Sequence, residues 1–418
     1  MALLIYAPRF NSRIDYAFRH IFENILGVSI AFTKNKEEFL QFEDAKIVYS
    51  IEDETRGLNF KAHPFIFEQN IKAQNLAFAD WEELKIPFPV NHSVFTFDVF
   101  AATFYLLSRY EEYVIKERDE QNRFEGKSSL AFQSGFLTRP MIDEWTYMIA
   151  DQIKKEFPDF RISPRKFHFQ PTLNIDQPYF YLTDAYFKQK VKKIKHQLKT
   201  DPFDIYEQVG IWDHQFGLNT LYFFLVGNQH ENDVAPSSEN ELFKELIKKV
   251  AEQHPVGIHL SYFSNSNPSE MRKERNLLIK MSQRKISLSR QNYLMLSFPK
   301  TYRDLIFSGI KEDYTLAYAD LPGFRASTCT PFHWYDLEKE SITDLLIHPI
   351  AFMDQTLKKY MRLDPDEAIQ LVSTLIENVK KVNGTFISIW SNDSVSDFGI
   401  WKEWKTVYLE MLKKGSAL

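Results

Sequence analysis

The first 160 residues alternate short apolar runs with longer amphipathic stretches. The expected strands are Leu3–Tyr6, Val28–Phe32 and Lys46–Ser50, and the expected helices are Ile14–Leu26, Phe97–Ile115 and Met141–Phe157. In the second of these helices Phe100, Phe104 and Leu107 recur at three- and four-residue intervals and share one face. The alternation of strands and helices predicts an N-terminal α/β region over residues 1–160.

A polar stretch with Pro158 and Pro164 follows and is interpreted as a linker. After it, apolar strand-like runs alternate with helical or polar stretches. These runs are Phe167–Ile175, Thr220–Val226, Val256–Tyr262, Ile286–Arg290, Tyr314–Ala319, Leu345–Ile350 and Thr385–Trp390. Strands that alternate with helices over about 250 residues are typical of a parallel sheet closed into a barrel. We therefore expect a distorted, seven-stranded (β/α) barrel over residues 166–418.

Polar residues gather where the expected barrel strands end. In a (β/α) barrel the loops at the carboxyl ends of the strands converge on one mouth, so reactive groups are sought there. The residues at these ends are Asn174, Asp176, His259, Phe263, Arg290, Asn292, Asp320, Arg325, Trp390, Ser391 and Asp393. The occurrence of Asp, His and Arg side chains at the ends of five separate strands is not expected by chance and indicates a functional site.

Composition and charge narrow the classes of protein. Apolar residues make up 44% of the 418 residues and aromatic residues 15%, which excludes a disordered chain. A formal charge of −5 favours no nucleic-acid partner. The one basic concentration, Lys188–Lys199, has the spacing of an amphipathic helix and is interpreted as a solvated face rather than a contact to an anionic glycan or a membrane. No apolar run of about 18 residues is present to span a bilayer.

The chain has a single cysteine, Cys329, so it forms no intrachain disulfide. This agrees with a reducing compartment, and the start MALLIYAP followed by Arg9 does not read as a signal peptide. We expect a cytoplasmic location. The oligomeric state is left open.

Five segments resemble, in order, the motifs of the polysaccharide deacetylases (the NodB-homology, carbohydrate esterase family). They are PTLNID at 171–176, VGIHLSYFS at 256–264, SRQNYL at 289–294, GFRASTCTPF at 323–332 and IWSND at 389–393. SRYEEY at 108–113 and RPMIDEW at 139–145 resemble the N-terminal region of one branch of that family. The resemblance implies a NodB-type barrel and metal-dependent hydrolysis of an amide or ester on a carbohydrate.

The resemblance assigns roles to individual positions. It implies that Asp176 and His259 are metal ligands and that Arg325 orients the catalytic base. It implies that the base position is residue 174 and the acid position residue 391. Substrate-contacting positions are expected at Asn292, Asp320, Trp390 and Asp393.

The chain departs from the family pattern at four of these positions. Asn174 replaces the base Asp, and an amide does not take up a proton. Phe263 replaces the second metal His, and a phenyl ring offers no lone pair to a cation. Ser391 and Asn292 each replace a His. We therefore expect no cofactor, or a divalent, zinc-like ion bound weakly by Asp176 and His259.

Further residues are candidates for parts of this site. His168, His254, Asp320 and Asp393 are the candidates for replacing the missing ligands. Trp334, Trp390, Tyr262 and Tyr293 are candidates for a wall on which a sugar ring stacks, with core packing as the alternative for each. Cys329 with His333 forms a conceivable nucleophile pair, with an inert core cysteine favoured.

The leading hypothesis is a deacetylase-like protein of surface-polysaccharide metabolism that is catalytically impaired and binds or regulates a glycan. The alternative is an active, metal-dependent carbohydrate deacetylase with a rearranged metal site. The two hypotheses differ in metal content and in turnover.

Overall fold

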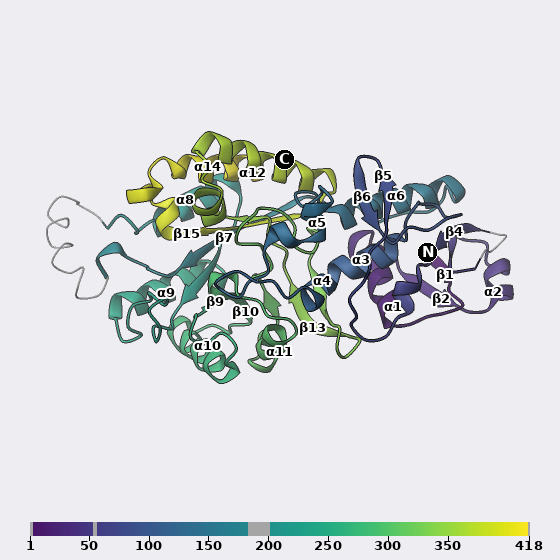
Figure 1. Cartoon of the computed structure of the whole chain (residues 1–418). Coiled ribbons are helices and arrows are strands. Elements are labelled where there is room, and N and C mark those ends of the chain that lie inside the picture. The colour runs from purple at the N-terminus through teal and green to yellow at the C-terminus, as the bar shows by residue number, and fades with distance from the viewer. Residues whose placement is uncertain (1–2, 53–56, 183–200, 417–418) are drawn as a thin grey trace.

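The computed structural model describes residues 3–52, 57–182 and 201–416. The described residues form two main sheets with their helices, one built by the N-terminal region and one by the rest, and a separate two-stranded hairpin in the N-terminal region (Figure 1). The predicted amphipathic helix at Lys188–Lys199 lies outside the described residues. Within the described ranges, every helix is too short or too polar to cross a membrane.

The N-terminal sheet has four parallel strands in the order β2-β1-β3-β4. Their bounds are β1 Leu3–Tyr6, β2 Ile30–Thr33, β3 Lys46–Ser50 and β4 Leu58–Lys61. The expected strands at 3–6 and 46–50 are confirmed, and β2 begins two residues later than expected. The fourth strand was not predicted from the sequence, and neither was the hairpin of β5 (Phe78–Trp81) and β6 (Leu84–Pro87).

The helices of this region follow the amphipathic pattern with one exception. The stretch 14–26 forms α1 (Ser12–Arg19) and continues as a π-helix (His20–Ile25), and α6 spans Met141–Glu156. The helix expected at 97–115 is divided into α3 (Val99–Leu107) and α4 (Tyr110–Val114). Arg109, at the division, has φ 56°, a left-handed conformation that a continuous helix does not contain. Its buried guanidinium contacts Glu111 and Glu112, and these contacts accompany the break.

The larger sheet has nine strands in the order β12-β13-β11-β10-β9-β8-β7-β15-β14. Their bounds are β7 His168–Ile175, β8 Leu221–Leu225, β9 Val256–Leu260, β10 Leu288–Gln291, β11 Glu312–Asp313, β12 Phe332–Asp336, β13 Ser341–Ile347, β14 Phe352–Met353 and β15 Thr385–Ser391. All neighbours run parallel except β12, which is antiparallel to β13.

This sheet is curled into a half barrel, and the expected closed barrel of seven strands is not confirmed. Its two edge strands, β12 and β14, were not predicted from the sequence. The run expected as a strand at 314–319 lies just after the two-residue β11 and is not part of the ladder. Backbone groups of that run are bonded irregularly instead, as in the bonds from Tyr314 N to Ser289 O and from Ile350 N to Leu316 O.

Helices cover the convex face of the half barrel. They include α8 (Tyr206–Phe216), α9 (Glu241–Gln253), α10 (Pro268–Ser282), α11 (Lys300–Phe307), α12 (Pro365–Lys381) and α14 (Trp404–Ser416). In Figure 1, α9, α10 and α11 lie below the sheet, and α12 and α14 lie above it. Because strand residues alternate between faces, Phe223, Ile387 and Ile389 point to the other face and form a separate buried cluster there. A Cβ on Gly257 would lie 2.5 Å from the Phe223 ring, so this cluster requires glycine at that position.

The N-terminal region covers the β12–β13 edge of the large sheet. The Tyr16 hydroxyl of α1 donates to the carbonyl of His333 at 2.7 Å, and Arg13 pairs with Glu340 at 2.5 Å. A sheet edge left open presents unpaired backbone groups to other chains. The two parts of the chain therefore form one packed body at this edge.

Candidate functional site at the carboxyl ends of the strands

His259 and Asp176 meet at the carboxyl end of the half barrel. His259 lies on β9, and Asp176 follows β7 directly, with β8 between these two strands. The His259 Nδ1 is 2.6 Å from Asp176 Oδ1, which places the ring N–H as donor to the carboxylate. His259 is buried, whereas the Asp176 side chain keeps 29% of its surface exposed. The structure thus brings the two predicted metal ligands together, with the carboxylate facing outward.

Asn174 is held by Arg290 from β10. The Arg290 Nη1 donates to Asn174 Oδ1 at 2.7 Å and Nη2 donates to Thr172 Oγ1 at 2.8 Å. The guanidinium lies over the Phe223 ring, 4.2 Å from its centroid, and is wholly buried. Burial lowers the pKa of Arg290 to about 9, which still leaves it charged at neutral pH. Among the described residues, no carboxylate forms an ion pair with this charge.

The orientation of the Asn174 amide follows from its partner. A guanidinium has only donors, so the amide must present its oxygen to Arg290 and its NH₂ group elsewhere. The Asn174 Nδ2 donates no hydrogen bond to any described residue, although Asn174 is only 7% exposed. The position that the family resemblance assigns to a base therefore carries an unpaired donor.

Ser391 and Asp393 lie beside this pair because β15 is the neighbour of β7. Ser391 is opposite Asn174 in the register, so Asp393 and Asp176 each follow by two residues at adjacent strand ends. Burial, and then the charge of Asp176, raises the pKa of Asp393. The Ser391 N–H donates to Asp354 Oδ2 at 2.9 Å, and burial raises the pKa of Asp354 to about 7. This end of the sheet thus gathers three carboxyl groups.

The donor set does not fit the three-ligand metal centre that the resemblance implies. Phe263 is 40% exposed and lacks a metal-binding atom. The Asn292 side-chain amide donates to Asp233 Oδ1 at 3.4 Å. In the part of the chain that the structure describes, no three His, Cys, Asp or Glu side chains are arranged to hold a metal ion. The two residues predicted to be metal ligands, Asp176 and His259, form a hydrogen bond with each other.

Three of the four proposed replacement ligands lie elsewhere. His168 is the first residue of β7, and His254 precedes β9, so both are at the amino ends of the strands. Asp320 accepts hydrogen bonds from the backbone N–H groups of Gly126 and Lys127 in the N-terminal region. Asp393 is the one replacement candidate that lies beside Asp176.

Arg325 belongs to a buried network that joins the two parts of the chain. Its guanidinium donates to both carboxylate oxygens of Glu112, at 2.8 and 2.5 Å. Glu112 also accepts from Arg109 at 2.9 Å, and Arg109 in turn donates to Glu111 and to the Tyr318 hydroxyl. The SRYEEY and GFRAST segments therefore contact each other. The guanidinium that contacts Asn174 is that of Arg290, whereas that of Arg325 contacts Glu112. The expectation that Arg325 orients residue 174 stays a prediction.

A second buried contact ties the RPMIDEW segment to the same loop. Asp143 accepts from Thr328 Oγ1 at 2.6 Å, from the Cys329 N–H at 3.1 Å and from Arg165 at 2.8 Å. Cys329 is wholly buried, and burial raises the pKa of its thiol. This placement is that of an inert core cysteine rather than a nucleophile. Both N-terminal segments thus fix the loop 323–332.

The four aromatic candidates divide into two pairs. Trp390 and Trp334 are buried, and Trp390 packs against Phe352 and Tyr408, so the predicted contact of Trp390 with a ligand is not available at the surface. The interior side of β15 belongs to Ile387, Ile389 and Ser391, and alternation turns Trp390 to the helix-covered side. Tyr262 and Tyr293 are partly exposed, with ring centroids 5.7 Å apart. The charge of Asp176 adds to burial in raising the pKa of Tyr293, so this ring borders the carboxylates.

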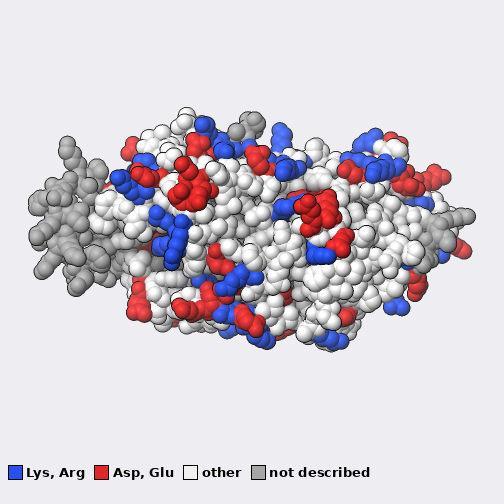
Figure 2. Space-filling view, turned by 45° about the horizontal axis from the view of Figure 1, so that its top comes forward, with Lys and Arg blue, Asp and Glu red and all other residues white. Residues whose placement is uncertain are grey.

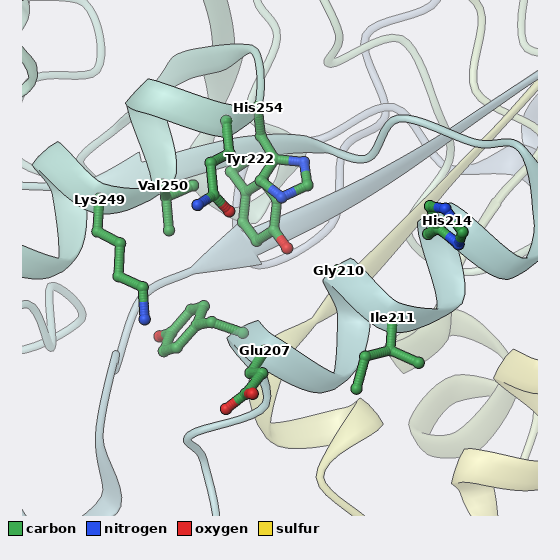
Figure 3. A pocket seen from close by; sticks show the side chains of 10 residues that line it. Glu207, Gly210, Ile211, His214, Tyr222, Lys249, Val250 and His254 are labelled. Atoms are coloured by element: carbon green, nitrogen blue, oxygen red, sulfur yellow. The ribbon is translucent and has the colours of Figure 1, made fainter.

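A separate cavity of about 850 Å³ lies between α8 and α9. Figure 3 shows Glu207, Ile211 and His214 reaching it from α8, and Lys249 and Val250 from α9. Tyr222 and His254, which also line it, belong to the amino ends of β8 and β9. The cavity is therefore at the opposite end of the strands from the candidate site.

The surface carries both signs of charge. On the face shown in Figure 2, Lys and Arg are interspersed with Asp and Glu among the described residues. This distribution offers no broad basic area on that face for a phosphate backbone. The expectation that nucleic acid is not a partner stays a prediction.

The class that the fold and site define is an α/β protein with polar groups at the carboxyl ends of a curled parallel sheet. A model described as a family of unknown function (DUF7033) matches residues 3–158. No curated protein matches this chain.

Solved structures similar to this chain include polysaccharide deacetylases. One assigned to that class from Mycobacterium smegmatis has 13% identity and a TM-score of 0.40, over 61% of this chain and 86% of the other. A polysaccharide deacetylase from Bacillus cereus has 14% identity and a TM-score of 0.30, over 59% and 86%. A CE4-family pseudoenzyme from Bacillus anthracis has 11% identity and a TM-score of 0.31, over 60% and 63%. Because these TM-scores are all 0.40 or lower, the fold described above rests on the strand order and register of this chain itself.

Proposed function

We propose that this chain is a deacetylase-like protein of carbohydrate metabolism that binds a glycan at the carboxyl ends of β7, β9 and β15 without deacetylating it. The observation that carries the proposal is the hydrogen bond between His259 and Asp176. These are the two residues that the sequence resemblance assigns to the metal. In this site they satisfy each other, and the expected third ligand is a phenyl ring.

The chemistry of the remaining groups argues against turnover. Asn174 does not accept a proton, and the Ser391 hydroxyl is a poor general acid at neutral pH. A general base and a general acid each contribute typically about 10²- to 10⁴-fold to a hydrolysis rate. Loss of both, with loss of metal activation of the attacking water, leaves little of the expected rate.

The same groups are suited to binding a sugar. Asp176 offers exposed acceptor atoms, and Asn174 offers an unpaired donor two residues away. Sugar hydroxyl groups both donate and accept, so an adjacent amide and carboxylate match them. The partly exposed rings of Tyr262 and Tyr293 supply an apolar surface beside these polar groups.

The single cysteine remains the observation behind an expected cytoplasmic location.

The proposal is tested by metal content, turnover and binding on the untreated full-length protein. We expect less than about a tenth of an equivalent of zinc or another divalent ion, and no acetate released from N-acetylated oligosaccharides. We expect calorimetric binding to an oligosaccharide that weakens at least about tenfold in Asp176→Asn, one factor of ten being about 1.4 kcal/mol. Asp397→Asn, at a carboxylate that faces Lys405, is the matched control. One bound metal per chain together with acetate release would establish the alternative, an active deacetylase with a rearranged site.

A restoration series separates a conserved pocket shape from a diverged one. Asn174→Asp, Phe263→His and Ser391→His together return the groups that the family resemblance implies. If the pocket shape is retained, the triple variant gains a bound divalent ion and measurable deacetylation, and the variants with only two of the changes gain less. A triple variant that folds but stays without metal would mean that the backbone at the strand ends has moved away from the family geometry.

A further inference from the structure

Two carboxyl groups, those of Asp176 and Asp393, lie at the carboxyl ends of β7 and β15, and His259 is the one basic side chain among the described residues that contacts them directly. Ser391 is paired with Asn174 in the register; Asp176 follows β7, and Asp393 lies in the short helix α13 (Asn392–Val395) after β15, near enough to Asp176 for its charge to contribute to the raised pKa of Asp393. Asp176 is paired with His259, and Asp393 accepts from the Trp401 indole N–H at 3.1 Å. Neither forms an ion pair with Lys or Arg among the described residues; the charge of Lys359 acts on Asp393 from further away. Two neighbouring carboxylates of this kind attract a cation.

The unpaired amide of Asn174 adds a second requirement. Its NH₂ group is turned away from Arg290 and needs an acceptor, and Asn174 itself is more than nine-tenths buried. The ligand must therefore place an oxygen against Asn174 while it places a positive group between the carboxylates. A hydroxyl next to an ammonium group meets both requirements.

The tyrosine rings beside the site also favour a positively charged group on the ligand. Tyr293 and Tyr262 lie edge to face, and the charge of Asp176 acts on Tyr293. The negative face of an aromatic ring stabilises a nearby cation. An N-acetyl group in this position would bring one N–H donor and no charge, whereas an ammonium group brings three donors and spans both carboxylates.

We propose that the glycan bound here is a de-N-acetylated amino sugar, with its ammonium group between Asp176 and Asp393 and the neighbouring hydroxyl oxygen accepting from Asn174. This inference rests on the proposed function and names the ligand class of the same site. The protein then recognises the product of a deacetylation rather than its substrate. A separate, active deacetylase must supply that product.

The test is a calorimetric titration of the full-length protein with three tetrasaccharides, made of glucosamine, N-acetylglucosamine or glucose. We expect the glucosamine form to bind at least about tenfold tighter than the other two at a pH that keeps its amines protonated. We expect this preference to weaken as salt rises, because salt screens exposed charges. Asp393→Asn removes one carboxylate and is expected to reduce glucosamine affinity about tenfold, with a smaller effect on the N-acetylated form.

The outcomes separate the two proposals. Equal or tighter binding of the N-acetylated form overturns the amino-sugar inference and leaves the glycan-binding function standing. Absence of binding to all three overturns both. Asp397→Asn, an Asp-to-Asn change four residues further along the chain, should leave the preference unchanged. Because the preference of the unsubstituted protein decides the matter, a folding defect in Asp393→Asn would not rescue the inference.

Discussion

Asn174→Asp is expected to stabilise the fold while it weakens ligand binding. The substitution replaces an amide oxygen, 2.7 Å from Arg290 Nη1, by a carboxylate. Arg290 is wholly buried and has only neutral partners in direct contact, namely Asn174, Thr172 and the Tyr314 carbonyl. A carboxylate at this position would give that buried charge an ion-pair partner.

The magnitude follows from the charges around residue 174. Two opposite charges about 4 Å apart attract by about 4 kcal/mol at an effective dielectric constant near 20. Asp176 lies two residues further along the chain, about 7 Å in an extended strand, and repels the new charge by about 2 kcal/mol. Burial of the carboxylate costs part of the remainder, so the net gain in the free energy of unfolding is about 1 kcal/mol.

The assay is urea unfolding followed by tryptophan fluorescence, with binding of the glucosamine tetrasaccharide measured on the same preparation. We expect a higher urea midpoint with an unchanged slope, and binding weakened at least about tenfold because the donor to the ligand is lost. Asn240→Asp is the control, because Asn240 caps α9 by accepting from Phe243 N and Asp caps a helix equally well. A lower midpoint than the control would refute the account of Arg290, and undiminished binding would refute the role of the Asn174 amide.

Three further predictions concern buried groups. Glu112→Gln leaves two buried arginines short of a counter-charge and should lower the free energy of unfolding by about 3 to 5 kcal/mol in urea titrations, whereas Asp159→Asn, in an exposed pair, should change it by less than about 1 kcal/mol. Asp354 has a folded-state pKa of about 7 against a usual 3.8, so its protonated form stabilises the fold below about pH 4 and this contribution is lost as the pH rises to 7. The free energy of unfolding of the unsubstituted protein, measured relative to that of Asp354→Asn, should therefore fall by a few kcal/mol, roughly, between pH 4 and pH 7. A constant difference would contradict the assignment. Cys329 should resist thiol reagents until the chain unfolds, and immediate labelling in native buffer would contradict its burial.

Local sequence pattern predicts the elements whose character is set locally. Apolar runs such as Leu3–Tyr6 and Thr385–Trp390 are strands, and the periodic stretch after Pro140 is helix α6. The helix expected at 97–115 is divided because Arg109 adopts a left-handed conformation, beside its ion pairs with Glu111 and Glu112 and its long-range hydrogen bond to the Tyr318 hydroxyl. Hydrophobic periodicity carries no information about such a residue. The short strand β14 was not predicted for a related reason, since two residues are too few to show an alternation of apolar and polar positions.

The site was predictable where strand ends alone decide the placement. Asp176, His259 and Asp393 follow or end parallel strands and are brought together by the sheet. Arg325 and Asp320 also follow a strand-like run, but their partners lie in the N-terminal region, up to 213 positions away. A pairing over that distance leaves no local signal. The predicted ligand contact of Trp390 depends on which residues of β15 face the interior of the half barrel. Ile387, Ile389 and Ser391 do so, and Trp390 therefore points outward into the helix layer.

The replaced positions are coupled to one another through their hydrogen bonds. Asn174 fits Arg290 because an amide oxygen satisfies a guanidinium donor, and His259 fits Asp176 without a metal because its N–H is satisfied by the carboxylate. Asn292 likewise donates to Asp233, which also accepts from the backbone of the turn that carries Phe263. Random loss of catalytic groups would leave buried polar atoms without partners, and each such atom costs about 1 to 3 kcal/mol. In this site Gln291 Nε2, next to Asn292, is such a buried atom, whereas the open polar groups of Asn174 and Asp176 face the ligand side. The hydrogen bonds that satisfy the replaced residues favour a site rebuilt for binding over one that has decayed. Substitution of Asn174 distinguishes these two explanations.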